Sequence, residues 1–409
     1  MRRPPRRTRR SGFTLVEILV VIVIIGILSA LLLPAISGAL KTAKDAAVTA
    51  DINSLANALA SFKEKYGDYP PSRIMLSENG RYDVDGTGPA GAMILSANGP
   101  SGRDITYAQL AQKSISYLRK FWPRVVISTT GNVWTANTQF YDFNGNGEFI
   151  TASPGTDDND TDNSDGFYGT ILEGDECLAF FLGGIPLNTG GTGAPAQWSM
   201  SGFGKLPTNP FSNNLNSSTA FMYNGNRTPP IFEFKNERLV DIVNTRFPKG
   251  NGFPSYTDSL GTGKPFAYFS GWSGGYDPND VNVAEADASS VSPILRVFRV
   301  SFSVRGSTSA TTNQLAASAP PNAYSSSPPN GLTTTQWEKG QTFQIISAGR
   351  DGEYGLGGLY TPTSKSQKLP LDADSPATGV DNLNLNTTDI EIRQSERDNL
   401  TNFASGPLE

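Results

Sequence analysis

The side chains in this sequence that are best able to do chemistry are its carboxylates. The chain has 409 residues, no histidine and one cysteine, Cys177. The lack of histidine excludes Ser-His-Asp and Cys-His nucleophiles, imidazole general bases and zinc sites built on histidine. Chemistry that uses carboxylates alone stays open, as in glycoside hydrolysis. A single cysteine excludes an intramolecular disulfide, so an exported domain would need another staple, such as a metal ion.

One acidic stretch has the spacing of a calcium loop. Asp142, Asn144 and Asn146 stand at positions 1, 3 and 5, and Gly147 stands at position 6. In such loops alternate residues point toward the ion, and the glycine permits a sharp turn. Position 12 is Ser153 and not the bidentate glutamate, so the stretch is not an EF-hand. The alternative is a solvated acidic turn that binds no metal.

A different carboxylate, Glu17, is notable for its apolar surroundings. Residues 13–36 read FTLVEILVVIVIIGILSALLLPAI, in which Glu17 is the only charge. About 20 apolar residues suffice to cross a bilayer, so this run is long enough to span one. A carboxylate inside a spanning helix costs up to a few kcal/mol and usually has a function. The alternative is a glutamate near the interface that reaches water.

The flank of this apolar run is strongly basic. Residues 1–12 read MRRPPRRTRRSG, with six arginines and no acid. This flank should stay cytoplasmic, which leaves the bulk of the chain outside. The net charge of the chain is −5, so the residues beyond the arginine-rich flank carry −11. An acidic body argues against nucleic acid as a main partner, because phosphate binding needs clustered lysine and arginine.

Residues 37–66 continue the apolar run as an amphipathic helix. One face carries a stripe of apolar residues at 4-3-4-3 spacing: Val48, Ile52, Leu55, Leu59 and Phe62. This face can pack on a globular domain, and the small, polar opposite face suits neighbouring subunits. An ordinary surface helix would give the same stripe. Pro34, near the end of the apolar run, removes a helix hydrogen bond and favours a kink or a melted turn, unless the helix simply ends there.

The rest of the chain predicts a β-rich body with long loops, because it holds most of the 42 glycines and 28 prolines. A helix is expected at 104–121, and a helix or strand around Cys177 at 171–182. Strands are expected at 265–269, 298–304 and 342–346, together with a hairpin that starts at Phe232 and Phe234 and turns at 236–237 into 238–243. Loops are expected at 72–103 and 306–335. One long helix followed by strands gives an α+β class.

The segment SGFTLVEILVVIVIIGILSALLLP, residues 11–34, resembles the class III signal of type IV prepilins. The resemblance implies that a prepilin peptidase cuts between Gly12 and Phe13 and that the new amino group of Phe13 is methylated. It implies that the apolar helix is retained as a membrane anchor and as the core of a filament. Glu17 matches the family's acid five residues into the mature chain, and Pro34 matches its helix-kinking proline. Glu17 would then pair with the amino terminus of a neighbouring subunit.

Three later segments resemble the major (G-type) pseudopilin of type II secretion systems. They are DSLGTGKPFAYFS at 258–270, FQIISAGRDGEYG at 343–355 and RDNLTNF at 397–403, with Leu260 in place of the family's tryptophan. This resemblance implies a calcium ion at Asp351 and the C-terminal acids, including Asp398. The alternative there is a turn held by Asp-Gly chemistry alone. The excess length of this chain lies mostly in residues 72–230 and 271–340.

These observations predict a pilin fold with a long helical spine packed on an antiparallel β-sheet domain. The predicted segments are a leader at 1–12, a transmembrane helix at 13–36, its amphipathic extension at 37–66, a loop-rich insertion region at 67–230, and a β-sheet body with calcium-type loops at 231–409. The chain would cross the bacterial inner membrane once, with its body in the periplasm.

The predicted function is structural and not enzymatic: a subunit of a type II secretion pseudopilus that helps to export folded proteins. The implied partners are copies of itself and other pseudopilins in a helical filament, the prepilin peptidase, the inner-membrane assembly platform and membrane lipid. One alternative is a type IV pilus subunit for adhesion, motility or DNA uptake. Another is a pilin-anchored carbohydrate-binding protein, with a sugar platform made by Trp134, Trp198, Trp272 and Trp337.

Overall fold

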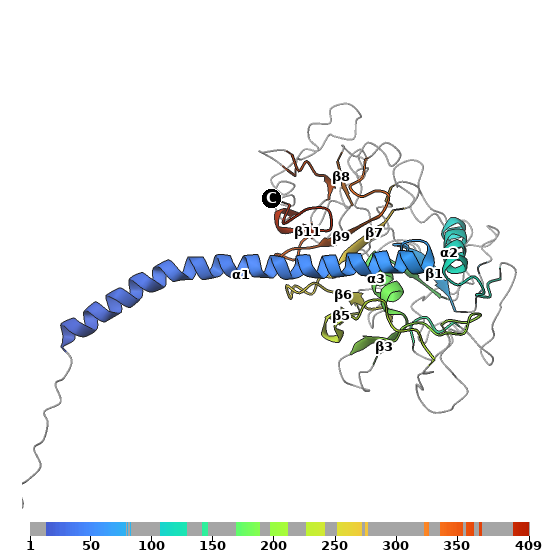
Figure 1. The fold of residues 1–409 in the computed structure, drawn as a ribbon, viewed down its shortest axis with the longest axis horizontal. Helices are drawn as coiled ribbons and strands as arrows, with labels where there is room; N and C mark the ends of the chain where they lie inside the picture. Colours follow the sequence, from blue (N-terminus) through green and yellow to red (C-terminus); the bar gives the residue numbers. More distant parts are fainter. Residues whose placement is uncertain are drawn as a thin grey trace, which may run out of the picture. The chain divides into compact units, whose positions relative to one another are not determined.

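The structure is a computed structural model, in which the described residues are 14–78, 80, 82, 107–128, 141–145, 169–188, 197–211, 226–241, 252–271, 275–276, 323–326, 336–354, 357–363, 368–369 and 396–408. The predicted strand at 298–304 lies outside these ranges. The chain divides into two compact units, Met1–Ala47 and Val48–Glu409. Helix α1 (Leu15–Tyr66) begins in the first unit and ends in the second (Figure 1).

Helix α1 is continuous over 52 residues, with Pro34 inside it. A melted turn at Pro34 is therefore not observed, and the Ser37 hydroxyl donates a hydrogen bond of 2.9 Å to the Pro34 carbonyl. Within the described part of the chain, α1 is the one helix long and apolar enough to cross a membrane. The predicted apolar stripe is confirmed, since all five of its residues, from Val48 to Phe62, are at most 1% exposed.

The body combines short helices with several small sheets, which confirms the α+β class. A three-stranded antiparallel sheet has the order β11 (Leu400–Thr401), β9 (Phe343–Ser347), β7 (Ala267–Ser270). The antiparallel pairs are β1 (Ile74–Ser77) with β2 (Gly169–Leu172), β3 (Pro186–Asn188) with β4 (Trp198–Met200), and β5 (Leu239–Val240) with β6 (Ser255–Tyr256). Strands β8 (Tyr324–Ser325) and β10 (Gly358–Leu359) pair in parallel. The helical elements are α2 (Tyr107–Phe121), α3 (Gly174–Gly183) and the 3₁₀ turns η3 (Asn236–Arg238) and η9 (Glu396–Asp398).

An aromatic cluster joins three helices in the body. The Phe62 ring of α1 lies 5.1 Å from the ring of Phe121 in α2 and 5.9 Å from that of Phe181 in α3, both in edge-on contact. Such pairs add to the free energy gained by burying the rings. Cys177 lies in α3 and is fully buried in the same core, as predicted for a packing residue. The amphipathic half of α1 is therefore part of the body's core.

Helix α3 ends where two backbones meet closely. Gly184, its C-cap, has φ of +89°, and a Cβ built there would lie 2.2 Å from the Gly202 Cα atom. Residues other than glycine avoid this φ, and no side chain fits the gap. The two glycines form a bridge next to the β3–β4 pair. The close approach explains why both positions carry glycine.

Several sequence predictions agree with the structure. The helix expected at 104–121 is α2, and the strands expected at 265–269 and 342–346 are β7 and β9. The segment around Cys177, expected to be a helix or a strand, contains the helix α3. The predicted domain boundaries at 67 and 231 stay predictions, although residues 67–230 contain α2, α3 and the strands β1 to β4.

The predicted hairpin at 232–243 is wrong. Residues 231–235 form no strand, and β5 pairs instead with β6, at 255–256. The backbone amides of Ile231 and Phe232 both donate to the Leu182 carbonyl, at 2.8 and 3.2 Å. The Phe234 ring lies 4.9 Å from the Tyr256 ring. The alternation of Phe232 and Phe234 therefore reflects aromatic packing of an extended segment and not a strand ladder.

Two of the expected loops contain strands. Ile74–Ser77, in the expected loop 72–103, is the fully buried strand β1, and Tyr324–Ser325, in the expected loop 306–335, is β8. A strand buried on both faces lacks the alternation by which strands are found in a sequence.

Two members of the expected sugar platform, Trp198 and Trp337, are buried, and the other two lie outside the described ranges.

Asp175, in the first turn of α3, gives the body a testable pH dependence. Its carboxylate accepts a 2.6 Å hydrogen bond from the Ser255 hydroxyl, and burial raises the pKa of Asp175 above its ordinary value. A raised native pKa favours the protonated folded form. Its stabilising contribution is therefore full below the unfolded pKa of about 3.9 and is lost as the pH rises through the native pKa. The Asp175→Asn variant should gain stability relative to the wild type over that rise, as measured by denaturant unfolding at several pH values. A difference that stays constant with pH would contradict this expectation.

The N-terminal helix and the C-terminal loop as candidate functional sites

The first candidate site is the start of α1, where Thr14 and Glu17 cap the helix. One Glu17 carboxylate oxygen, Oε2, accepts hydrogen bonds from the Thr14 amide at 2.7 Å and from the Thr14 hydroxyl at 2.8 Å. In return the Glu17 amide donates to the Thr14 hydroxyl at 3.2 Å. This is a capping box, which satisfies donors that a helix start leaves unpaired. Its sequence signal, Thr-x-x-Glu before an apolar run, is present at 14–17 and was missed by the sequence analysis.

The Glu17 carboxylate lies on an apolar surface. The large apolar side chains of α1 from Leu15 to Leu40 are about half exposed or more, and Leu15 itself is 80% exposed. Exposing so large an apolar surface to water is unfavourable, so this half of α1 fits a lipid environment or contact with other helices. Glu17 is the one acid in the first turn of this surface. The predicted cleavage residues, Gly12 and Phe13, lie outside the described part of the chain.

The second candidate site is the C-terminal loop, defined here as residues 349–354 together with residues 396–399, which contain η9. The Arg350 amide donates a 2.8 Å hydrogen bond to Asp398 Oδ2, and the Arg350 guanidinium lies 3.5 Å from the same oxygen. Gly349 has φ of +70°, and a Cβ there would lie 2.3 Å from Asp398 Oδ1. Only glycine therefore lets the two segments of this loop approach each other. The structure thus places the predicted residues Asp351 and Asp398 in one loop system.

Acidic side chains gather in this loop, and some of their buried oxygens accept no hydrogen bond from the protein. Three buried oxygens there have no hydrogen-bond donor: Asp398 Oδ1, Glu353 Oε2 and Asn399 Oδ1. Burial, with the negative charges of Asp398 and Glu353, raises the pKa of Asp351 to about 6. Asp351 is itself exposed, so solvent moderates the repulsion. Buried acceptors without donors cost free energy unless a cation or water meets them.

These oxygens fit calcium in kind, since Ca²⁺ takes carboxylate, amide and carbonyl oxygens. Over the described ranges, no three acidic, cysteine or histidine side chains gather closely enough to hold a metal ion by themselves. A calcium ion here would therefore also need backbone carbonyls or water as ligands. Glu353 and Asn399 were not among the residues predicted for this site. They are recognised by their buried oxygens without hydrogen-bond donors, which only the structure shows, and not by their spacing in the sequence.

The calcium-type stretch at 142–146 has a different setting. Asp142 is fully buried, and a Cβ on Gly145 would lie 2.1 Å from the Pro186 carbonyl oxygen. The described part of this stretch is therefore packed into the core, so it is not the solvated turn that stood as the alternative. Asn144 is half-buried and Asn146 lies outside the described residues. Calcium at Asp142, Asn144 and Asn146 stays a prediction.

Comparison with known proteins finds similarity at the N-terminal part of the chain. Residues 7–33 match the prokaryotic N-terminal methylation motif. The chain is 43% identical over 65 residues to the type II secretion system core protein G of Aeromonas hydrophila, and 41% identical over 68 residues to that of Pseudomonas aeruginosa. These matches cover 16% and 17% of this chain and 46% and 48% of the relatives. The chain thus spans about half the length of these relatives.

A third relative is matched over most of its length. The type IV wide pilus major component PilA4 of Thermus thermophilus is 31% identical over 111 residues, which cover 26% of this chain and 85% of that protein. No solved structure gives a significant match.

An apolar N-terminal helix with a capped glutamate, continued by an amphipathic half that packs into an α+β body, is the architecture of a pilin fold. With the methylation motif and the relatives above, the chain belongs to the type IV pilin-like family. The matched residues 7–33 include Glu17 and most of the apolar run at 13–36.

Proposed function

We propose that this chain is a subunit of a type II secretion pseudopilus, anchored in the inner membrane with its body in the periplasm. The proposal rests on the observation that three segments resembling one pseudopilin family lie together in one sheet. Residues 258–270, 343–355 and 397–403, which resemble the G-type pseudopilin, contribute β7, β9 and β11 of one sheet. The similarity to core protein G of two bacteria supports the same assignment.

Assembly would use the two halves of α1 differently. In the first half, apolar side chains would pack against those of other subunits, and Glu17 would meet the amino terminus of a neighbour. A carboxylate and an ammonium group brought together in an apolar layer neutralise each other and thereby fix the step between subunits. In the second half the exposed face is small and polar, with Ser54 and Ser61 bonded back to their own helix. Such a face lets helices approach closely.

A surface pilus is the second candidate, because the pilus component of Thermus thermophilus is the relative that the chain matches over 85% of its length. Deletion of the gene separates the two. Loss of secreted proteins from the medium, with surface fibres unchanged, supports the secretion pseudopilus. Loss of fibres or twitching with normal secretion contradicts it and supports the pilus.

We also propose that the C-terminal loop binds calcium through Asp351 and Asp398, with Glu353 and Asn399 as further oxygen donors. The ion would neutralise the acids and supply the missing partner for Asp398 Oδ1. The loop would then be fixed without a disulfide.

Calcium should therefore stabilise the folded chain, and the Asp398→Asn variant should lose most of this effect. A ligand present at 100 times its dissociation constant stabilises a protein by about 2.7 kcal/mol. The measurement is the Tm of the full chain in detergent micelles with calcium and with a chelator. Asp68→Asn is the matched control. It makes the same change of acid to amide at a partly exposed residue that pairs with Lys120 and does not belong to the C-terminal loop. A wild-type Tm that ignores the chelator would rule out the calcium site.

A further inference from the structure

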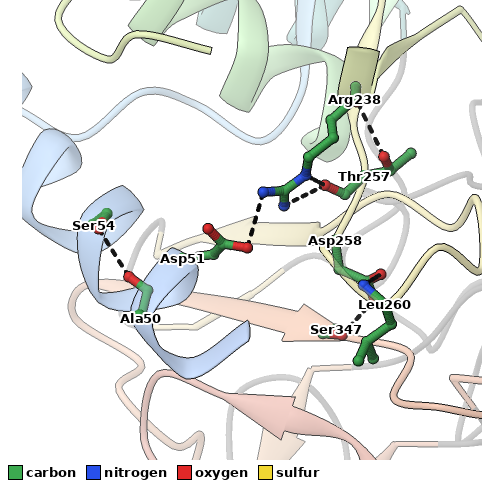
Figure 2. Close-up of polar contacts among 8 residues, drawn as sticks. All are labelled: Ala50, Asp51, Ser54, Arg238, Thr257, Asp258, Leu260 and Ser347. Carbon is green, nitrogen blue, oxygen red and sulfur yellow. Dashed lines mark hydrogen bonds and ion pairs between the residues drawn. The ribbon is translucent and has the colours of Figure 1, made fainter. Parts of the chain in front are cut away.

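Arg238 joins the spine helix to the body at a point that sequence patterns do not mark. Its guanidinium Nη1 lies 2.9 Å from Asp51 Oδ2, and Asp51 belongs to α1. Both side chains are largely buried, at 10% and 22% exposure. Figure 2 shows the side chain of Arg238, the last residue of η3 and the residue just before β5, reaching toward Asp51. This ion pair connects α1 to the strand pair β5–β6.

The same guanidinium also bonds to the backbone at Thr257. Arg238 Nε and Nη2 donate hydrogen bonds of 2.8 and 2.6 Å to the Thr257 carbonyl, and the Thr257 amide and hydroxyl donate to the Arg238 carbonyl at 2.9 and 3.1 Å. The guanidinium also lies 4.3 Å from the Tyr256 ring centroid, as a cation–π contact. These contacts fix the orientation of Arg238, so a shift of Asp51 would act on residue 257 and beyond.

The next residue continues the connection to the C-terminal loop. Asp258 is buried, and its Oδ2 accepts a 2.7 Å hydrogen bond from the hydroxyl of Ser347, the last residue of β9 (Figure 2). The Ser347 hydroxyl in turn accepts from the Gly349 amide at 3.3 Å. Gly349 opens the C-terminal loop and lies against Asp398.

A second contact brings the same two segments together. The Tyr354 hydroxyl donates to the Pro265 carbonyl, so residues 258–265 contact the end of β9, just before the C-terminal loop, and also Tyr354 within the loop. The charges also act on one another. Burial raises the pKa of Asp258 above its ordinary value, while the charges of Arg238 and Asp51 act on it in opposite directions.

We propose that Arg238 is a positioning residue that couples α1 to the C-terminal loop, through Asp51 on one side and Thr257, Asp258 and Ser347 on the other. Ordering of the loop would then strengthen the docking of α1 on the body, and docking of α1 would order the loop, because coupling between two sites is reciprocal. The coupling extends the proposed function: an event at the loop would change how firmly the body holds the helix through which subunits assemble.

Hydrogen–deuterium exchange of the full chain in detergent micelles tests the coupling. Ser347→Ala removes the hydroxyl that bonds Asp258, and we expect amide exchange in α1 over 48–62 to rise several-fold, beyond the local change at 343–354. In an Asp51→Asn background, Ser347→Ala should no longer raise exchange in α1. Distant, independent sites give additive effects, so this loss of effect would reveal the coupling.

Two variants serve as controls. Ser347→Thr keeps the hydroxyl and should leave exchange in α1 at the wild-type level. Asp68→Asn breaks an exposed ion pair just beyond the end of α1, and in this background Ser347→Ala should still act on 48–62. If Ser347→Ala does not fold, Asp51→Asn alone gives the reciprocal measurement, in which exchange at 343–354 should rise. The proposal is overturned if each variant changes exchange only around its own position.

A last experiment, with calcium, distinguishes failure of the coupling from failure of the calcium site. This experiment rests on the proposed calcium site, whereas the mutational experiments above do not. Calcium should lower exchange both in the C-terminal loop and in α1 of the wild type. In Arg238→Lys, which keeps the charge but cannot make both bonds to Thr257, it should lower exchange in the loop alone. No change anywhere with calcium refutes the calcium site and leaves the mutational result to decide the coupling. A protected α1 in Arg238→Lys refutes the coupling.

Discussion

Replacing Glu17 with alanine should abolish filament assembly while leaving the protein in the membrane. The physical reason is that Glu17 is the one carboxylate on an exposed apolar helix surface, where an ammonium group of a neighbouring subunit would be its strongest partner. Without it, that ammonium group would lie in an apolar layer without a counter-ion. The measurement is the yield of sheared or cross-linked filament from cells, with the membrane fraction of the same cells as reference.

The capping box supplies the matched control for this experiment. Thr14→Val removes the hydroxyl that bonds Glu17 but leaves the carboxylate in place. Loss of such a cap costs about 1 kcal/mol of helix stability, which a membrane helix tolerates. Filaments should therefore persist in Thr14→Val. Equal loss of filament in the two variants would mean that Glu17 acts only as a helix cap.

The second large effect is expected at Phe62, where the spine enters the core of the body. Phe62 is fully buried and its ring contacts those of Tyr66, Phe121 and Phe181. Phe62→Ala should cost about 3–5 kcal/mol, because it removes buried apolar surface and leaves a cavity among three helices. Denaturant unfolding of the full chain in micelles, followed by tryptophan fluorescence, measures this loss.

An exposed neighbour calibrates the result. Ser61→Ala changes the residue just before Phe62 in α1, whose hydroxyl bonds to the Asn57 carbonyl of the same helix, and should stay within about 0.5 kcal/mol of the wild type. A loss at Phe62 no larger than that at Ser61 would contradict the packing of the spine into the body's core.

The sequence was most informative where one physical requirement dominates. A run of apolar residues that crosses a membrane, and a stripe at 4-3-4-3 spacing that packs on a core, leave few alternative structures, so α1 and its buried face could be predicted residue by residue. Strands β7 and β9 were found because their apolar runs are bounded by glycine or polar residues. The α+β class follows from these elements alone.

Other features depended on partners distant in the sequence. Strand β1 has no alternation because both its faces are buried, and it is defined by pairing with β2, which lies nearly a hundred residues later. The pattern at Phe232 and Phe234 suggested a hairpin, but the position of Leu182 and Tyr256 decided otherwise. Arg238 could not be predicted as a link to Asp51, because nothing local marks an ion pair between residues so far apart.

The candidate sites divide in the same way. Glu17 was predictable because a single charge in an apolar run is costly wherever it lies. Asp351 and Asp398 were proposed from a resemblance, and the structure brings them into one loop system. The unsatisfied oxygens of Glu353 and Asn399 are consequences of tertiary burial that no spacing in the sequence encodes.

The central claim is that the apolar helix is retained in the mature protein as an assembly helix. Mass spectrometry of the N-terminal peptide of the protein purified from its native membrane tests this claim most directly. The expected peptide begins at Phe13, carries a methyl group on its amino nitrogen and continues through Glu17. A mature protein that begins beyond Pro34 would have lost the helix and would contradict the account.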